Sequence, residues 1–400
     1  MMIPYGYKQT EVGVIPEDWE CTTAKQLMKI ETGSRNTENK TNTGIYPFFV
    51  RSQKIESIDT YHYNCEAVLT AGDGVGTGKV FHYYIGKFDA HQRVYVMSGF
   101  NGISGRYFYY YFSENFEKEV SKYTAKSSVD SVRHDMIAEM KIPLPPLPEQ
   151  QRIAEALSDV DGMISSLEKL IAKYKSIKTA CLQQMFPQNG ETVPRMRLPG
   201  FTGAWEQRKL GDIGKARSGV GFPDADQGGV TGVPFFKVSD MNLDGNENEM
   251  TVANNYVTAE QIADHRWSPI TELPAIFFAK VGAAVMLNRK RLCRFPFLLD
   301  NNTMAYSLSP TKWDADFAKA LFGTIDLTSL VQVGALPSYN AGDVESMEIY
   351  LPSLLEQEQI GAFFKQLDNL ITLHQRKLVK VQKIKQGMMQ QLLTGKIRLV

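Results

Sequence analysis

The sequence contains few of the residues that mark secreted, zinc-stabilised or membrane-spanning proteins. Its 400 residues include only four cysteines, which are Cys21, Cys65, Cys181 and Cys293. They lie too far apart for a CxxC zinc site or a dense disulfide framework, so reduced thiols and a cytoplasmic location are expected. The N-terminal segment lacks an apolar signal core, and the apolar run 276–287 is short and contains Lys280. Neither secretion nor a membrane span is predicted.

An excess of either charge sign is also absent. Lysine and arginine total 44, aspartate and glutamate total 44, and the formal net charge is zero. Any attraction for nucleic acid must therefore come from segregated charge and not from bulk charge. With 43% hydrophobic and 22% charged residues, the chain has the composition of a globular protein.

Motifs of catalytic and cofactor sites are missing as well. The glycine-rich segment 71–80 has Asp73 and Val80 where a phosphate loop needs Gly and Ser or Thr, and Lys79 where a dinucleotide motif needs its third Gly. This segment favours a strand-turn-strand, either a plain tight turn or one whose backbone approaches DNA phosphate. The six histidines show no metal-ligand spacing, and no GxSxG, kinase or amino-methyltransferase motif occurs. We expect no catalytic residue, metal or cofactor in this chain.

An internal repeat organises the sequence. Residues 142–164 align without a gap on residues 349–371, at an offset of 207, and residues 178–186 align on 385–393 at the same offset. Identical pairs in this register include Leu144/Leu351, Glu149/Glu356, Gln150/Gln357 and Asp161/Asp368. Upstream the similarity is weaker, but Trp19-Glu20 corresponds to Trp205-Glu206. The chain is interpreted as a tandem duplication of a variable block followed by a long helix.

The two predicted long helices have coiled-coil spacing. After each proline-containing segment a Glu-Gln pair opens the helix, and apolar residues then recur in steps of four and three. The seam residues are Ile153, Leu157, Val160, Ile164, Leu167, Ile171, Ile360, Phe364, Leu367, Ile371, Leu378 and Val381. His374 also falls in this seam and is interpreted as a packed imidazole in preference to a pH switch.

The length of the helices predicts their relative direction. The first helix would be about 57 Å long, whereas a domain of the size of the second block is about 30 to 40 Å across. This block leaves the first helix at its C-terminus and enters the second at its N-terminus, so those two ends must be close. The two helices are therefore predicted to run antiparallel, with pseudo-twofold symmetry between the halves.

The blocks before the helices are predicted to mix strands with a few helices. Alternating runs at 67–72, 79–86 and 93–99 indicate strands, and helices are expected at 106–122, 258–264 and 313–322. The fold class is α+β, with two mixed α/β domains separated by two long antiparallel coiled-coil helices. The expected division is 1–144 for the first block, 145–187 for hinge and helix, 188–351 for the second block, and 352–400 for hinge, helix and tail.

Basic and hydroxyl residues in the blocks are candidates for DNA contact. No acid occurs between Glu272 and Asp300, a stretch that includes five cations, although a solvated hairpin edge would explain the cluster too. Aromatics at 107–112 could stack on bases but are more often core. The candidate DNA-binding residues are Ser34, Arg35, Thr77, Lys79, Lys126, Ser127, Arg217, Ser218, Lys237, Lys280, Asn288, Arg289, Lys290 and Arg291.

The whole chain resembles the specificity subunit of type I restriction-modification systems. The resemblance is carried by IPLPPLPEQQRIAEAL and IYLPSLLEQEQIGAFF, by the helix endings LQQMF and MQQLLTGKI, and by the block openings EVGVIPEDWE and RLPGFTGAWEQRKLGDI. It implies a non-catalytic DNA reader whose blocks are two target recognition domains, one for each half of a bipartite asymmetric site. The helices would be spacers that set the gap between the half-sites.

The resemblance also implies partners. Two methyltransferase subunits using S-adenosylmethionine and restriction/translocase subunits using ATP and Mg²⁺ would join the chain, which would hold none of these cofactors itself. Each methyltransferase would be placed beside an adenine that is flipped from the duplex. The alternatives are a stand-alone methyltransferase or nuclease, and a coiled-coil scaffold whose blocks bind protein or carbohydrate. Binding of S-adenosylmethionine tests the first, and salt-dependent binding of duplex DNA tests the second.

Overall fold

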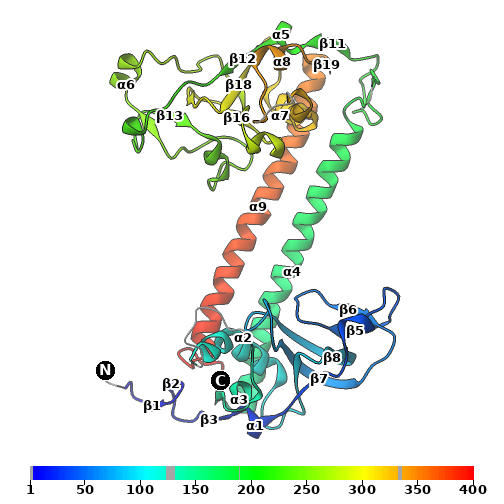
Figure 1. Cartoon of the computed structure of the whole chain (residues 1–400), viewed down its shortest axis with the longest axis vertical. Helices are drawn as coiled ribbons and strands as arrows, with labels where there is room; N and C mark the ends of the chain where they lie inside the picture. The colour runs from blue at the N-terminus through cyan, green and yellow to red at the C-terminus, as the bar shows by residue number, and fades with distance from the viewer. Residues whose placement is uncertain (1–2, 123–130, 189, 332–335) are drawn as a thin grey trace. The chain divides into compact units, whose positions relative to one another are not determined.

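The computed structural model describes residues 3–122, 131–188, 190–331 and 336–400 (Figure 1). Internal contacts divide the chain into unit 1, which comprises Met1–Glu168 with Arg376–Val400, and unit 2, which comprises Lys169–Gln375. Each unit therefore contains one block and a part of each long helix. The predicted division assigned each helix to a segment of its own, whereas the contacts share both helices between the units.

The block of unit 1 is built on a six-stranded sheet with strand order β4-β9-β7-β8-β5-β6. Its strands are β4 (Lys29–Thr32), β5 (Tyr46–Phe49), β6 (Glu56–Ile58), β7 (Tyr63–Ala71), β8 (Phe81–Ala90) and β9 (Val94–Ser98). Neighbours are antiparallel except β5 and β8, which are parallel. The three predicted strands coincide with β7, β8 and β9.

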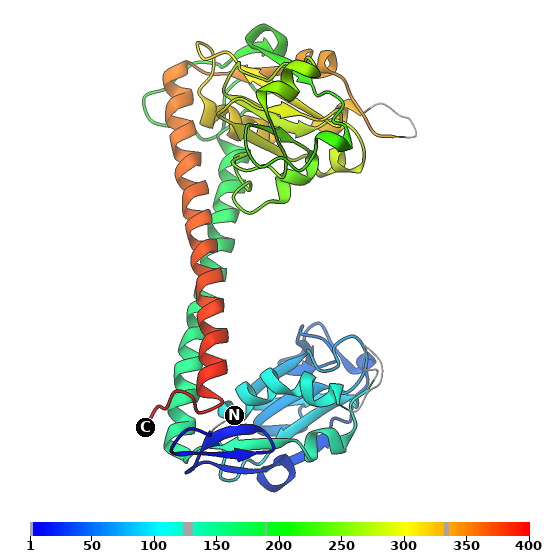
Figure 2. The same cartoon turned by 90° about the vertical axis from the view of Figure 1, so that its left-hand side faces the viewer.

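Helix α2 (Gly105–Ser121) lies along β7 and β8 and supplies much of the core of unit 1 (Figure 2). It begins after Ser104, whose hydroxyl accepts a hydrogen bond from the Tyr107 backbone N–H at 3.3 Å. Phe108, Phe112 and Phe116 are fully buried. The helix agrees with the predicted 106–122, and these three rings form core, as the commoner interpretation of the aromatic run expects.

Shorter elements complete the block of unit 1. Two N-terminal strands form an antiparallel hairpin, and β3 pairs with β10, so the strand just before the first long helix returns to the start of the block. The elements are β1 (Tyr7–Thr10), β2 (Gly13–Pro16), β3 (Glu20–Thr23), α1 (Ala24–Leu27), η1 (Thr37–Asn39), α3 (His134–Ala138) and β10 (Lys141–Leu144).

The block of unit 2 contains a four-stranded sheet with order β12-β18-β15-β16, a three-stranded sheet with order β14-β13-β17, and the pair β11-β19. The strands are β11 (Glu206–Lys209), β12 (Gly214–Ser218), β13 (Val233–Phe236), β14 (Tyr256–Val257), β15 (Ala275–Ala279), β16 (Lys290–Cys293), β17 (Leu298–Leu299), β18 (Thr303–Leu308) and β19 (Glu348–Leu351). The strand β16, which carries Lys290 and Arg291 of the basic cluster, is an edge strand of its sheet.

The helices of this block begin at polar caps. Thr258 caps α6 as predicted, with its hydroxyl accepting from the Gln261 backbone N–H at 3.3 Å. Asp314 caps α7 by accepting from the Phe317 backbone N–H at 2.7 Å, so α7 begins two residues later than the predicted 313–322. The helical elements are α5 (Leu210–Ile213), η2 (Asp224–Asp226), η3 (Val238–Asn242), α6 (Ala259–Asp264), η4 (Ala283–Leu287), α7 (Ala315–Thr324), η5 (Leu327–Leu330) and α8 (Ala341–Glu345).

The two long helices are α4 (Leu147–Gln184) and α9 (Leu354–Leu392). In unit 1 the first part of α4 meets the last part of α9, where Lys385 pairs with Asp161 at 2.6 Å. In unit 2 the last part of α4 meets the first part of α9, where Lys178 pairs with Asp368 at 2.5 Å. Opposite ends meet in both units, so the predicted antiparallel pairing is confirmed. The two ion pairs are related by the 207-residue offset.

The helix seam has more partners than the heptad pattern predicts. Ile153 and Leu157 belong to the core of the first block, and Ile360 and Phe364 belong to the core of the second. Farther along the helices, the predicted seam residues Ile164, Leu167, Leu378 and Val381 are half-buried. The start of each stripe is therefore buried by a block as well as by the other helix.

His374 stacks its ring on Tyr174 with 5.6 Å between centroids and 6° between planes, which confirms the packed interpretation. Within the described residues, no helix is both long and apolar enough to cross a bilayer.

Candidate nucleic-acid interface

The glutamine of each Glu-Gln pair joins a long helix to its block. In unit 1 the Gln150 side chain is fully buried, accepts from the Ser104 backbone N–H at 2.8 Å and donates to the Pro145 carbonyl at 2.8 Å. In unit 2 the Gln357 side chain accepts from the Asp314 backbone N–H at 3.0 Å and donates to a proline carbonyl in the same way. Ser104 and Asp314 are the caps of α2 and α7. Gln therefore fixes the start of each long helix to the start of a block helix.

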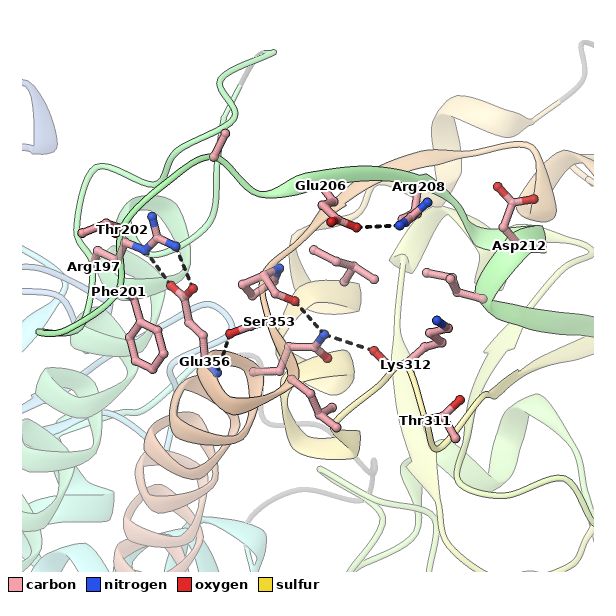
Figure 3. Close-up of a pocket in the computed structure, with 16 residues that line it drawn as sticks. Arg197, Phe201, Thr202, Glu206, Arg208, Asp212, Thr311, Lys312, Ser353 and Glu356 are labelled. Atoms are coloured by element: carbon pink, nitrogen blue, oxygen red, sulfur yellow. Dashed lines mark hydrogen bonds and ion pairs between the residues drawn. The ribbon is translucent and has the colours of Figure 1, made fainter.

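The glutamate of each pair joins the two long helices. Arg398, which follows α9, donates to both carboxylate oxygens of Glu149 at 2.7 and 2.8 Å. Arg197, which follows α4, donates to both oxygens of Glu356 at 2.8 Å (Figure 3). Both carboxylates are buried, and such bidentate pairs are the strong class of ion pair. Hydrogen bonds to Glu149 and then to Asp18 raise the pKa of the Arg398 guanidinium.

A cavity of about 510 Å³ lies beside the Arg197–Glu356 pair at the start of α9 (Figure 3). Four of its charged lining residues form two ion pairs, since Arg208 donates to Glu206 at 2.6 Å in addition to the Arg197–Glu356 contact. The cavity belongs to the joint between helix and block. The Glu-Gln pairs that belong to the motifs of the family resemblance thus act as structural joints.

The predicted DNA contacts of unit 1 differ in their exposure. Ser34 and Lys79 are exposed. Arg35 is half-exposed and pairs with the fully buried Asp89 at 2.9 Å, so it also stabilises the block. The Thr77 hydroxyl is buried and donates to the Gly74 carbonyl at 2.7 Å, which holds the turn together and turns the hydroxyl away from solvent. The candidates Lys126 and Ser127 lie outside the described residues.

The fold adds further cations to the glycine-rich turn. Arg51 and Arg93 flank Asp73 at 3.0 and 3.7 Å, and their side chains are 46% and 65% exposed. Burial, followed by the charge of Arg51, lowers the pKa of the neighbouring His91. Neither Arg51 nor Arg93 is among the candidate DNA-binding residues predicted from the sequence, because both lie on other loops that only the fold brings beside the turn. We call Arg51, Lys79 and Arg93 the glycine-turn surface.

In unit 2 the predicted contacts gather where strands end. Arg217 and Ser218 close β12, Lys237 follows β13, and Lys280 follows β15. The ends of these strands meet near Asp300, whose backbone N–H donates to the Phe236 carbonyl at 3.0 Å. Burial raises the pKa of the Asp300 carboxyl, and the hydrogen bonds that the carboxyl accepts oppose this rise without cancelling it. We call Arg217, Ser218, Lys237 and Lys280 the strand-end surface.

Two of these side chains are tethered. The Lys237 ammonium donates to Gln227 at 2.6 Å and lies 5.5 Å from the centroid of the Phe222 ring. Arg217 reaches Ser268 at 3.4 Å, whereas Ser218 is exposed. These contacts orient the cations without burying them, which suits residues that position a phosphate backbone.

The basic cluster 288–291 is not the exposed surface that the sequence suggests. Asn288 has left-handed backbone geometry (φ 49°), and its side chain donates to the Ile325 carbonyl at 3.2 Å. Lys290 is half-buried and donates to Asn288 at 2.7 Å and to the same carbonyl, and burial lowers its pKa to about 8. Arg291 is half-buried and donates to the Asn246 carbonyl at 2.6 Å.

Arg289 makes a hydrogen bond to Asn242 at 2.7 Å. The cluster does lie on a sheet edge, as the alternative interpretation predicts, but Lys290 and Arg291 direct their donors to internal carbonyls. As open phosphate contacts they are therefore poorly placed.

Within the described part of the chain, no group of three or more His, Cys, Asp or Glu residues is placed to hold a metal ion.

Two equivalent units, each with basic loops on a mixed block attached to paired helices, define a tandem recognition protein. The sequence model of the type I restriction modification DNA specificity domain matches this chain twice, over residues 16–177 and 203–383. The chain belongs to this family and is a type I specificity subunit that recognises a DNA target.

Individual relatives agree with this assignment. A Methanocaldococcus jannaschii protein named as the type I restriction enzyme MjaX specificity subunit is 27% identical over 98% of this chain and 96% of that protein. The type I restriction enzyme EcoDI specificity subunit of Escherichia coli is 30% identical over 46% of this chain and 41% of its own length. The crystal structure of a type I S subunit from M. genitalium has the same fold, with a TM-score of 0.66, 15% identity, and coverage of 94% of this chain and 96% of the other.

Proposed function

We propose that this chain is the non-catalytic reader of a bipartite, asymmetric DNA target, with one half-site read by each block. The observation that carries the proposal is the duplication: each family match contains most of one block and most of the helix that follows it. The two blocks share their joints to the helices but differ in their loops. Two different loop sets on one repeated frame are suited to read two different half-sites.

The glycine-turn surface and the strand-end surface are the proposed DNA contacts. The exposed cations of the glycine-turn surface and the half-buried cations of the strand-end surface supply phosphate contacts, and Ser218 and the neighbouring loops supply groups that can reach base edges. A chain with no net charge needs such local clusters to attract duplex DNA. Arg289 is treated separately below, because it lines a cavity.

The proposed partners are two methyltransferase subunits and restriction/translocase subunits, in the cytoplasm. S-adenosylmethionine, ATP and Mg²⁺ would be held by those partners and not by this chain. The repeat supports two equivalent docking positions, since the joints around Glu149 and Glu356 have matching contacts. The long helices would then fix the number of base pairs between the half-sites.

The function is tested by genome-wide methylation mapping in strains with and without this chain. We expect one bipartite motif to lose its methylation when the chain is removed. Loss of no motif, or binding of S-adenosylmethionine by the isolated chain, contradicts the proposal.

The glycine-turn surface is tested by a matched pair of variants. Lys79→Gln removes an exposed cation from the turn, and Lys118→Gln removes an exposed cation from α2 of the same unit. In the complex with methyltransferase subunits, K79Q should weaken duplex binding and reduce the slope of log affinity against log salt by about 0.9, the value for one phosphate contact. K118Q should leave the slope unchanged. Equal slopes for the two variants would remove Lys79 from the interface.

A further inference from the structure

Unit 2 contains a second cavity, of about 320 Å³, between the basic cluster and the long helices. Six cationic side chains line it, namely Lys178, Arg289, Lys290, Arg291, Lys319 and Lys365. Three carboxylates line it as well, namely Glu247, Asp316 and Asp368. Cations therefore outnumber anions in a confined space that is partly shielded from water.

The two inner carboxylates are already shared between cations. Asp368 accepts from Lys178 at 2.5 Å and from Lys319 at 2.7 Å. Asp316 accepts from Lys365 at 2.9 Å and from Arg294, which lies outside the cavity lining, at 2.6 Å. The third carboxylate, that of Glu247, is exposed. Neither inner carboxylate is left to neutralise the basic cluster.

The three cations of the cluster form no ion pair within the described residues. Lys290 and Arg291 are satisfied by neutral oxygens, and the Arg289 Nε atom is buried without a hydrogen-bond partner. Burial, followed by the charge of Arg289, lowers the pKa of Arg291. Crowded cations whose hydrogen-bond acceptors are all neutral are an arrangement that a bound anion would stabilise.

We propose that this cavity binds a phosphate group, with Arg289 and Lys365 as contacts. The planar guanidinium suits the oxygens of phosphate, and its buried Nε atom would gain the partner it lacks. The cavity volume, about 320 Å³, is at the lower end of the range for small-molecule sites and has room for a phosphate with its ester substituents. The phosphate could belong to the DNA backbone or to a free phosphate compound. Only the first source rests on the proposed function.

The experiment uses two probes. Binding of inorganic pyrophosphate to the full chain is followed by titration calorimetry, and binding of a generic duplex to the complex with methyltransferase subunits is followed over a range of salt. Arg289→Gln and Lys365→Gln each remove one cation from the cavity. Lys215→Gln, an exposed residue on β12 that does not line the cavity, is the control of equal charge change. Lys365 is half-exposed on a helix surface, so K365Q should fold normally. This variant still tests the cavity if R289Q fails to fold.

We expect R289Q and K365Q to weaken binding of at least one probe about tenfold, whereas K215Q binds both probes like the wild type. Loss of pyrophosphate binding alone assigns the site to a free phosphate compound. A salt slope reduced by about 0.9 assigns it to the DNA backbone. If the wild type ignores duplex DNA but binds pyrophosphate through Arg289, the proposed function fails and the cavity site stands. If neither probe depends on Arg289 or Lys365, the inference is wrong.

Discussion

At the scale of single residues, side-chain partners decide which cations of this chain can reach DNA. Lys79 is exposed, whereas Lys290 is half-buried beneath carbonyl groups and Arg35 is anchored by Asp89. All three have similar sequence surroundings, in that each follows or precedes glycine, asparagine or another cation. The sequence therefore predicts where basic residues gather, but it does not show which of them are exposed enough to reach DNA. Their exposure depends on residues such as Ile325 and Asp89 that the fold brings close.

Lys290 provides a prediction about pH. Burial lowers its pKa to about 8 from an ordinary value of 10.5, so between these values the unfolded chain binds more protons than the folded one. The free energy of unfolding contributed by this lysine should rise with pH over that interval. Lys290→Met removes the contribution. The free energy of unfolding of the wild type, measured in urea, should therefore rise relative to that of K290M between pH 7.5 and pH 10. An identical pH dependence in the two proteins would show that the ammonium is not the cause.

At the scale of elements, the repeated ion pairs hold α4 against α9 with unequal strength. Asp368 is buried and shared by Lys178 and Lys319, whereas Asp161 has one lysine partner and is 35% exposed. Burial raises the pKa of Asp368, but the two lysines outweigh burial and lower it overall. Its stabilising effect is therefore present above about pH 4 and is lost as the pH falls through the lowered value.

Replacement of these carboxylates compares the two positions. Asp368→Asn should destabilise unit 2 by about 3 kcal/mol, because it leaves two ammonium groups in a buried position. Asp161→Asn, the matched change in unit 1, should cost about 1 kcal/mol, since the Asp161 carboxylate is 35% exposed and neutralises a single lysine. Urea unfolding at pH 7 measures both. Equal losses would mean that burial of the pair does not set its strength.

Two seam leucines, which are not equivalent in the repeat, compare a part of the seam that a block covers with a part that none covers. Leu367 is 7% exposed and belongs to the core of unit 2, whereas Leu167 is half-buried. Leu367→Asp places a carboxylate in that core and should cost more than about 3 kcal/mol. Leu167→Asp should have a smaller effect, measured as the shift in the thermal unfolding midpoint. A larger shift for L167D would contradict the finding that the blocks cover the starts of the helices.

At the scale of the whole molecule, α4 and α9 both pass from one unit into the other. The joints at Glu149 and Glu356 are confined to single units, so each block keeps its own attachment when the helices change length. This separation lets the loops that read DNA vary independently of the segments that connect the units.

Insertion of one heptad after Glu168 and another after Gln375 lengthens both helices at equivalent positions. A heptad preserves the seam register and adds about 10 Å, close to the rise of three base pairs. Methylation mapping should show a longer gap between unchanged half-sites. Altered half-sites would contradict the spacer role. A heptad inserted in one helix alone should abolish methylation, because the two helices then differ in length by about 10 Å and cannot both span the two units.

The sequence by itself determined the duplication, the two long helices and their antiparallel pairing, because these depend on periodicity and on chain length, which a one-dimensional pattern records. It also located the strands β7, β8 and β9 and the cap at Thr258, which are local features. Only the tertiary structure decided that Gln150 binds the cap of α2, that Arg197 binds Glu356, and that the cluster 289–291 borders a cavity. Those outcomes depend on burial and on partners 35 to 159 residues apart, and neither is written in the local pattern.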